Sequence, residues 1–135
     1  MTTPERSLII RGPEPLLYVS DINRSVAFYC DTLGFKLLES YRPEDKLCWC
    51  RVARGGSALM LQQVSATKND EPKRGHGIIF YFLCVDAGAI HAELKSAGLE
   101  LEPPKTAFYG MNQLEFPDPD GYALCFQSIA GSQTQ

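Results

Sequence analysis

The sequence predicts an α+β fold built from two tandem modules, each a strand, a helix and three further strands. The first observation behind this prediction is a repeated pattern, Gly-x-Ala-Leu-x-x-Gln, which stands at residues 56–62 and again at 121–127. The second is that a strand-like apolar segment followed by an amphipathic helix-like segment opens each half of the chain. An internal repeat of this kind indicates two copies of one supersecondary unit.

The chain length sets the expected domain organisation. A chain of 135 residues is typical of one compact domain and can bury a core without a disulfide or a structural metal. We therefore expect residues 1–135 to form a single domain, with a first module at about 13–63, a linker at 64–75 and a second module at about 76–128. The linker is polar and contains Asn, Asp, Pro and Gly residues, which favour turns.

In the first module, the predicted helix follows a strand that ends near Val19. Ser20 or Asp21 can cap this helix by accepting a backbone N–H bond, and Gly34 suits the left-handed residue that ends many helices. Four apolar residues at helical spacing form the face that packs on the sheet: Ile22, Val26, Tyr29 and Leu33. Three strands are then predicted, at 35–41, 46–53 and 57–63.

The second module repeats this order. Residues 16–21 match 82–87, which is an offset of 66, and Asp86 is the expected helix cap. The pair Pro103-Pro104 removes ladder donors and predicts a short, broken or edge strand. The turn signal at 118–121 precedes the last strand. The apolar face of the second helix is expected to consist of Ala87, Ile90, Leu94 and Ala97.

Composition excludes several classes of function. Thirteen Lys and Arg against sixteen Asp and Glu give a net charge of -3, which argues against a nucleic-acid partner and against a polybasic membrane module. No apolar run approaches the ~20 residues of a membrane span, and no signal peptide is recognised at the start. The five cysteines are an odd number, which favours reduced thiols over a disulfide framework. We therefore expect a cytoplasmic protein.

A series of short motifs runs in a fixed order along the two halves. These motifs are 18–21, 25–29, 33–35, 85–86, 94–98, 109–111 and 118–122. Over about residues 13–128 the chain resembles the vicinal-oxygen-chelate superfamily, which includes glyoxalase I, extradiol dioxygenases and bleomycin-resistance proteins. The resemblance implies two βαβββ modules forming a curved mixed sheet around a cleft. It also implies a frequent homodimer, sometimes with modules paired across chains.

The resemblance also makes a statement about metal. Metal-binding members place one ligand on the first strand and one on the last strand of each module, and these positions fall on Glu14, Met60, Phe80 and Cys125. A Phe side chain has no donor, and a Met thioether is a poor ligand for the usual divalent metals. We therefore expect neither a metal nor another cofactor, and place the chain closest to the metal-free bleomycin-resistance-like branch.

Strand alternation in phase with these positions indicates which side chains face the implied cleft. Trp49, Arg51, Tyr109 and Asn112 are added because the resemblance places their strands and loop beside the ligand. No acid–base pair or nucleophile stands out, so catalytic residues are not assigned. The expected cleft residues are Glu14, Leu16, Tyr18, Trp49, Arg51, Met60, Gln62, Phe80, Phe82, Tyr109, Asn112 and Cys125.

A cleft with aromatic walls and few polar groups suits a small aromatic or amphiphilic molecule. The leading hypothesis is therefore a metal-free binding protein, with antibiotic sequestration as one form of it, that acts as a homodimer with a small-molecule ligand. Two alternatives stay open. One is a diverged glyoxalase-like lyase or isomerase that uses Glu14 as a base or recruits His76 to a metal. The other is a dimeric protein whose cleft is filled by side chains.

Overall fold

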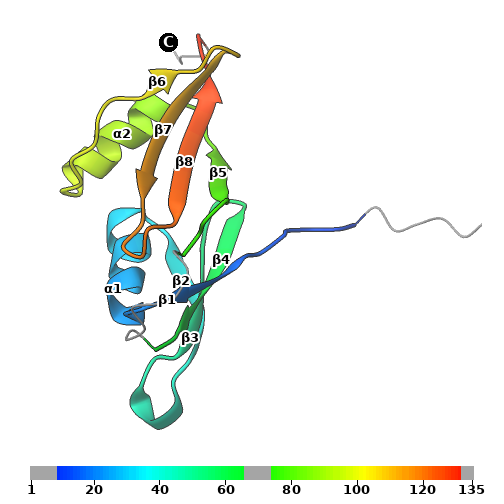
Figure 1. Ribbon diagram of the computed structural model, residues 1–135, viewed down its shortest axis with the longest axis vertical. Helices are drawn as coiled ribbons and strands as arrows, with labels where there is room; N and C mark the ends of the chain where they lie inside the picture. The colour runs from blue at the N-terminus through cyan, green and yellow to red at the C-terminus, as the bar shows by residue number, and fades with distance from the viewer. Residues whose placement is uncertain (1–8, 66–73, 132–135) are drawn as a thin grey trace, which may run out of the picture.

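The computed structural model describes residues 9–65 and 74–131. Figure 1 shows two small sheets arranged end to end along the long axis of the molecule, with helices on the same side of both. Each sheet has four strands and combines one parallel pair with antiparallel pairs. This is the predicted α+β architecture of two βαβββ modules. Most of the predicted linker, 64–75, lies outside the described residues.

The first module, residues 16–63, begins with β1 and ends with β4, and these two strands pair in parallel. Its sheet has the order β1-β4-β3-β2. The strands are β1 (Leu16–Val19), β2 (Lys36–Tyr41), β3 (Trp49–Arg54) and β4 (Ser57–Gln63). The helical segments are α1 (Ile22–Val26), the π-helix η1 (Ala27–Thr32) that continues it, and the 3-10 turn η2 (Pro43–Asp45). The predicted strand at 46–53 therefore starts three residues later than expected.

The second module, residues 79–129, repeats the arrangement with the order β5-β8-β7-β6. Its edge strand β6 has only two residues and follows Pro103-Pro104, as the lack of proline ladder donors predicted. The elements are β5 (Ile79–Leu83), α2 (Ala87–Ser96), β6 (Lys105–Thr106), β7 (Met111–Pro117) and β8 (Ala123–Ile129).

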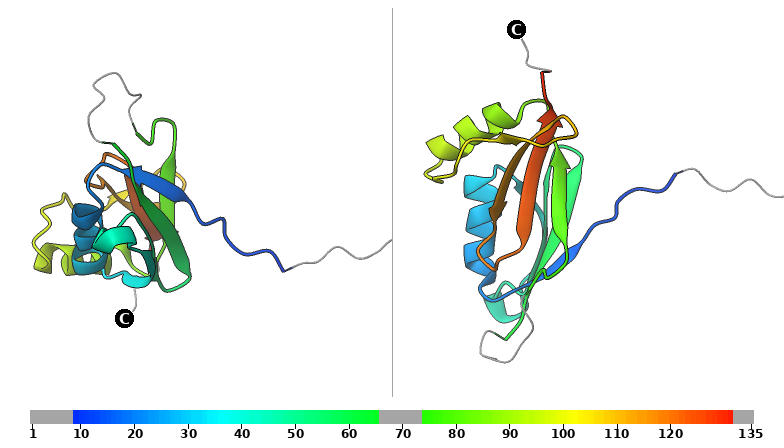
Figure 2. Two further views of the ribbon diagram at one scale, coloured as in Figure 1. Left: turned by 90° about the horizontal axis from the view of Figure 1, so that it is seen from below. Right: turned by 45° about the horizontal axis from the view of Figure 1, so that its top comes forward.

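The two modules share one hydrophobic core. Aromatic rings bridge them, since Phe35 lies 6.0 Å from Phe82 and Phe28 lies 6.4 Å from Phe116, between ring centroids. Phe82 also stacks on Phe126 at 4.8 Å. Both views of Figure 2 keep α1 and α2 on one side of the sheets, while the chain before β1 projects away from the body. The opposite face of both sheets is therefore left without a helical cover.

The strand registers correct the predicted sequence offset between the first strands of the two modules. β1 pairs Leu16 with Met60, and β5 pairs Tyr81 with Cys125. Because Met60 and Cys125 occupy the same place in the repeat, Leu16 corresponds to Tyr81, and the offset is 65 rather than 66. The caps agree, since Asp21 accepts a bond from the N–H of Arg24 and its counterpart Asp86 from the N–H groups of Gly88 and Ala89. A one-residue slip exchanges the two faces of a strand.

Candidate functional site

Each sheet has one face against the core and one open face. Paired residues on neighbouring strands point to the same side of a sheet, so the registers define rows on the open face. In the first module one row contains Tyr18, Gln62, Trp49 and Tyr41. The next row contains Leu16, Met60, Arg51 and Glu39. Six of the residues predicted for the cleft therefore lie together on this face, and Tyr18 is 52% exposed there.

Glu14, just before β1, reaches over this face to Arg51. Arg51 Nε donates to Glu14 Oε1 at 2.6 Å, and Nη2 donates to Oε2 at 2.9 Å. A third donor, Nη1, lies 3.5 Å from Glu39 Oε1. The hydrogen bond from Arg51 holds the pKa of Glu14 below its ordinary value. A carboxylate whose pKa is lowered is a weaker base, which weighs against Glu14 as a general base.

The two phenylalanines of β5 lie on the face opposite to the one predicted. Phe82 is only 8% exposed and belongs to the core, and Phe80 is half-buried with its ring 6.4 Å from Tyr122. Ile79, Tyr81 and Leu83 take the open face instead and are 44%, 47% and 79% exposed. The reason is the offset of 65, which reverses the phase of this strand.

The open face of the second module carries a hydrogen-bonded polar group beside its aromatic residues. Gln113 Nε2 donates to Tyr109 Oη at 2.6 Å and to Gln127 Oε1 at 3.1 Å. Cys125 lies in the row of Tyr81 and is fully buried. Burial raises the pKa of Cys125 to about 11, so its thiol stays protonated at neutral pH.

Asn112 does not lie on the open face, contrary to the prediction. It pairs with Ser128, whose hydroxyl accepts a bond from the N–H of Ala87 at the start of α2. The side chain of Asn112 accepts a bond from Thr106 Oγ1 at 2.6 Å. It therefore belongs to the helix side of β7, one residue out of phase with Gln113.

A groove of about 630 Å³ lies between the two modules on this side of the molecule. Of the predicted residues it brings together Glu14, Arg51, Phe80 and Phe82. The lining residues outside the predicted set include Arg11, Leu38, Ile79 and Tyr81. Aligning the two helix caps, Asp21 and Asp86, gives the offset of 65 and would have assigned Ile79 and Tyr81 to the open face. Leu38 stands at a bulge in β2, which strand alternation does not reveal.

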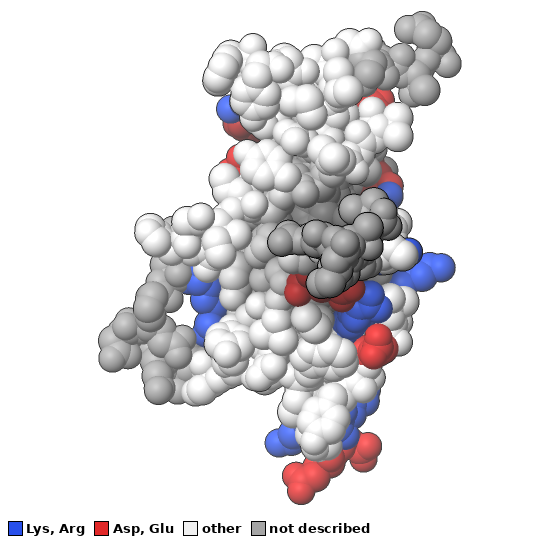
Figure 3. Space-filling model, turned by 90° about the vertical axis from the view of Figure 1, so that its right-hand side faces the viewer, with Lys and Arg blue, Asp and Glu red and all other residues white. Residues whose placement is uncertain are grey.

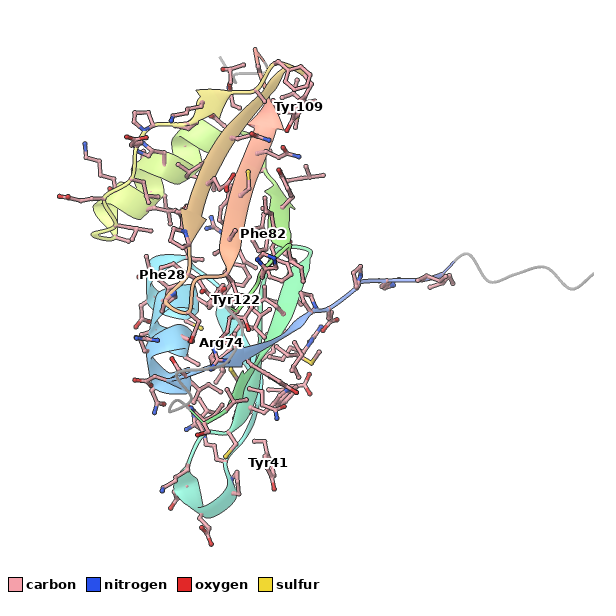
Figure 4. All side chains as sticks on the ribbon, viewed as in Figure 1. Phe28, Tyr41, Arg74, Phe82, Tyr109 and Tyr122 are labelled. Atoms are coloured by element: carbon pink, nitrogen blue, oxygen red, sulfur yellow. The ribbon has the colours of Figure 1, made fainter. Side chains whose placement is uncertain are left out.

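Aromatic side chains extend this region to both ends of the molecule. Figure 3 looks onto the open side, where uncharged residues dominate and a few charged ones interrupt them. Figure 4 places Tyr41 beyond one end of the groove, on the first module, and Tyr109 near the far end of the second. Phe82 lies between them at the junction of the modules, where it is buried in the core. The arrangement offers an elongated apolar and aromatic surface with an ion pair near its middle.

Comparison with known proteins agrees with this geometry. The family model for the Glyoxalase/Bleomycin resistance protein/Dioxygenase superfamily matches residues 13–126. The chain belongs to this superfamily. No curated protein matches the chain.

Three solved structures have a similar fold. An antibiotic binding protein, TnmS3 of Streptomyces sp. CB03234, is 25% identical with a TM-score of 0.66, over 92% of this chain and 100% of that one. A glyoxalase/bleomycin resistance protein/dioxygenase from Nocardioides is 18% identical with a TM-score of 0.68, over 94% and 90%. A virulence protein of Salmonella typhimurium is 23% identical with a TM-score of 0.65, over 92% and 100%.

Some members of the superfamily bind a metal, but the residues at the corresponding positions of this chain are poor metal ligands. Glu14 is held by Arg51, Met60 offers a thioether, and the corrected register replaces Phe80 with Ile79, which has no donor either. Cys125 remains a protonated thiol. Within residues 9–65 and 74–131, no three His, Cys, Asp or Glu side chains are grouped as metal ligands. His76 is exposed and lines a separate pocket with Gly121.

The helices were also tested for membrane spans. In the described part of the chain, none combines the length and the apolar character that crossing a bilayer requires.

Proposed function

We propose that this member of the superfamily binds a small aromatic or amphiphilic molecule on its open face without a metal. The observation that carries the proposal is the groove of about 630 Å³ beside exposed aromatic rows. Ligand sites are typically concave and apolar with a few placed polar groups. Arg51 and Glu14 supply such polar groups here, while Leu38, Ile79 and Phe80 supply apolar walls.

Sequestration of an antibiotic is the form of this function that we favour. The support is the 25% identity to TnmS3, described as an antibiotic binding protein, over its whole length. The protonation states of the groups near the groove also suit binding better than acid–base catalysis. The pKa of Glu14 is lowered by Arg51, and burial raises the pKa of Cys125 to about 11.

We further propose that the ligand site is completed in a homodimer. The open faces of both modules lie on one side of the chain, so neither covers the other. Several large apolar residues are exposed there, and contiguous exposed apolar surface is typical of an interaction site. A second copy that lays its second module over the first module of its partner would enclose the aromatic rows. All five cysteines are free, which supports the cytoplasm as the compartment.

The test is binding of planar aromatic antibiotics to purified protein before and after dialysis against EDTA. Trp49 is the only tryptophan, so its indole N–H gives one NMR signal that reports on the open face. We expect a subset of the compounds to shift this signal, with affinity unchanged by EDTA. Tyr18→Ala should weaken binding several-fold, because a buried aromatic contact contributes ~1–3 kcal/mol.

Leu37→Ala is the control, since this apolar residue is 40% exposed but pairs with the buried Val52 and lies outside the two rows of the first module. A stoichiometric divalent metal whose removal abolishes binding would contradict the metal-free proposal. An unchanged Trp49 signal with every compound would contradict ligand binding at this face.

A further inference from the structure

The ion pair in the groove has the geometry by which arginine recognises a carboxylate ligand. Two N–H groups of the Arg51 guanidinium meet the two oxygens of Glu14 at 2.6 and 2.9 Å. Such a two-point arrangement fits planar carboxylates and is more specific than a single charge contact. The edge of Arg51 that carries these donors therefore already has the geometry to bind a carboxylate, and in this structure that carboxylate is Glu14.

Glu14 is held less firmly than Arg51. Arg51 stands in the interior strand β3, between β2 and β4. Glu14 precedes β1 in a segment, residues 11–15, that forms one wall of the groove. The backbone bond from Met60 N–H to the Pro15 carbonyl, at 2.8 Å, fixes the end of this segment next to β1. Glu14 can thus be displaced by a movement of the segment before Pro15, whereas Arg51 cannot leave without disturbing the sheet.

We infer that Arg51 determines ligand specificity by binding a carboxylate of the ligand, and that Glu14 occupies this position until the ligand arrives. The inference rests on the proposed function and names the ligand class within it: an aromatic carboxylate. The acid group meets the edge of Arg51 that Glu14 now occupies. The ring lies on the apolar walls formed by Leu38, Ile79 and Phe80.

A cationic ligand fits the same site less well. To pair with Glu14 it would have to compete with the two N–H groups of Arg51 that already bind both carboxylate oxygens. Exchange of one carboxylate for another keeps Arg51 paired throughout. Glu14 is 38% exposed, and ion pairs at such exposure are weak enough for a ligand to compete with them.

The experiment compares 2-naphthoate with its neutral analogue 2-naphthamide. Affinity is measured by calorimetry, and occupancy of the face by the Trp49 indole signal. Trp49 and Arg51 are two residues apart on one strand, or about 7 Å, and point to the same side. We expect wild-type protein to prefer the carboxylate by about fivefold or more. Arg51→Gln should abolish the preference.

Glu14→Gln should strengthen naphthoate binding about fivefold, because it removes the competing charge while keeping the side-chain shape. Glu39→Gln is the matched control: it changes the net charge equally, but Glu39 lies 3.5 Å from a different guanidinium nitrogen. We expect it to change naphthoate affinity less than twofold. Circular dichroism of each variant verifies that the fold is intact.

Equal affinity for the two compounds in wild-type protein, with no gain in Glu14→Gln, would overturn the role of Arg51 and leave the proposed function standing. If neither compound binds or shifts Trp49, the aromatic ligand site fails together with this inference. An equal gain in Glu14→Gln and Glu39→Gln would show a general charge effect and would also overturn it.

Discussion

The two modules share a scaffold and differ on their open faces. In the first module, Gln63 Oε1 accepts a bond from the N–H of Ile22 at the start of α1, at 2.8 Å. In the second module, Ser128 Oγ accepts the equivalent bond from Ala87 at 2.9 Å. These residues are related by the offset of 65, so the attachment of helix to sheet repeats although the side chains do not.

The open faces do not repeat in this way. The first module presents an aromatic row and the Arg51–Glu14 ion pair, whereas the second presents amide and phenol groups around Gln113 and a carboxylate, Glu115, in the row of Tyr81. A position that attaches the helix needs only one hydrogen-bond acceptor for the backbone N–H at the helix start, and different side chains, such as Gln or Ser, can supply it. Positions on the open face are free of this constraint, and under the proposed function their difference would let the two halves contact different parts of a ligand.

The largest expected effect tests the corrected register of β5. Phe82→Ala should reduce the free energy of unfolding by about 3–5 kcal/mol, because it leaves a cavity in the shared core. Tyr81→Ala, one residue away and 47% exposed, should cost much less. Urea unfolding followed by circular dichroism measures both. If Tyr81→Ala lost more free energy of unfolding than Phe82→Ala, Tyr81 would be the core residue, and the offset between the modules would be 66 at this strand.

A second prediction concerns the polar contact that joins the modules. Tyr29 Oη donates to Asp118 Oδ2 at 2.7 Å, and both groups are buried. Tyr29→Phe should cost about 1–3 kcal/mol at pH 7, since it removes a bond to a buried charged group. Burial already raises the pKa of Asp118, whereas the bond from Tyr29 lowers it, so its removal raises that pKa further.

The sign of the pH effect follows from this shift. The Tyr29 bond favours the ionised form of Asp118, so it stabilises the fold above the pKa and much less once Asp118 is protonated. The cost of Tyr29→Phe should therefore shrink as the pH falls from 7 toward about 4. Tyr122→Phe is the control, because its hydroxyl donates to the neutral carbonyl of Tyr18 at 2.7 Å. A parallel pH dependence in both variants would contradict this account.

A third prediction compares the two helix attachments directly. Gln63 also donates from Nε2 to the carbonyls of Ser20 and Val64, at 2.7 and 2.8 Å. The side chain of Ser128 has one hydrogen bond within the described residues, the one from Ala87. Gln63→Ala should therefore cost about 1–3 kcal/mol and Ser128→Ala about 1 kcal/mol in the free energy of unfolding. Hydrogen exchange of the Ile22 and Ala87 amides should rise in the corresponding variant only. Equal losses would mean that the extra bonds of Gln63 contribute nothing.

Sequence reasoning predicted the elements of both modules because each carries its own local signal. Asp86 precedes an amphipathic helix, and the Gly-x-Ala-Leu pattern fixes β4 and β8. The face of β5 was wrong because both phases of this strand are apolar, so alternation does not choose between them. The match of Val19 to Val85 then placed the strand one residue out of phase. The helix caps, Asp21 and Asp86, hold the correct offset because their position is fixed by hydrogen bonds.

The site was predicted in part for the same reason. In the first module, Met60 was assigned to the open face as a ligand position of the family, and the resemblance assigned Trp49 and Arg51 to the same face, which the register of β3 with β4 confirms. Leu38 was missed because it stands at a bulge between Leu37 and Glu39, where strand alternation does not assign a face. The contact of Glu14 with Arg51 joins residues 37 positions apart and depends on a segment without regular structure. No local pattern specifies such a contact.

The smallest expected effect on stability is that of Glu14→Gln, which tests whether the ion pair belongs to the open face or to the scaffold. Glu14→Gln should leave the unfolding midpoint in urea unchanged at pH 7, because an exposed ion pair adds little to stability. Since the pKa of Glu14 is lowered in the folded protein, what the pair does add is present above the ordinary pKa and is lost as the pH falls below it. The same substitution is expected to change carboxylate affinity. If the variant alters binding and not stability, Glu14 belongs to the open-face residues, which differ between the modules, and not to the scaffold, which repeats. A clear loss of stability at pH 7 would instead make the ion pair part of the scaffold.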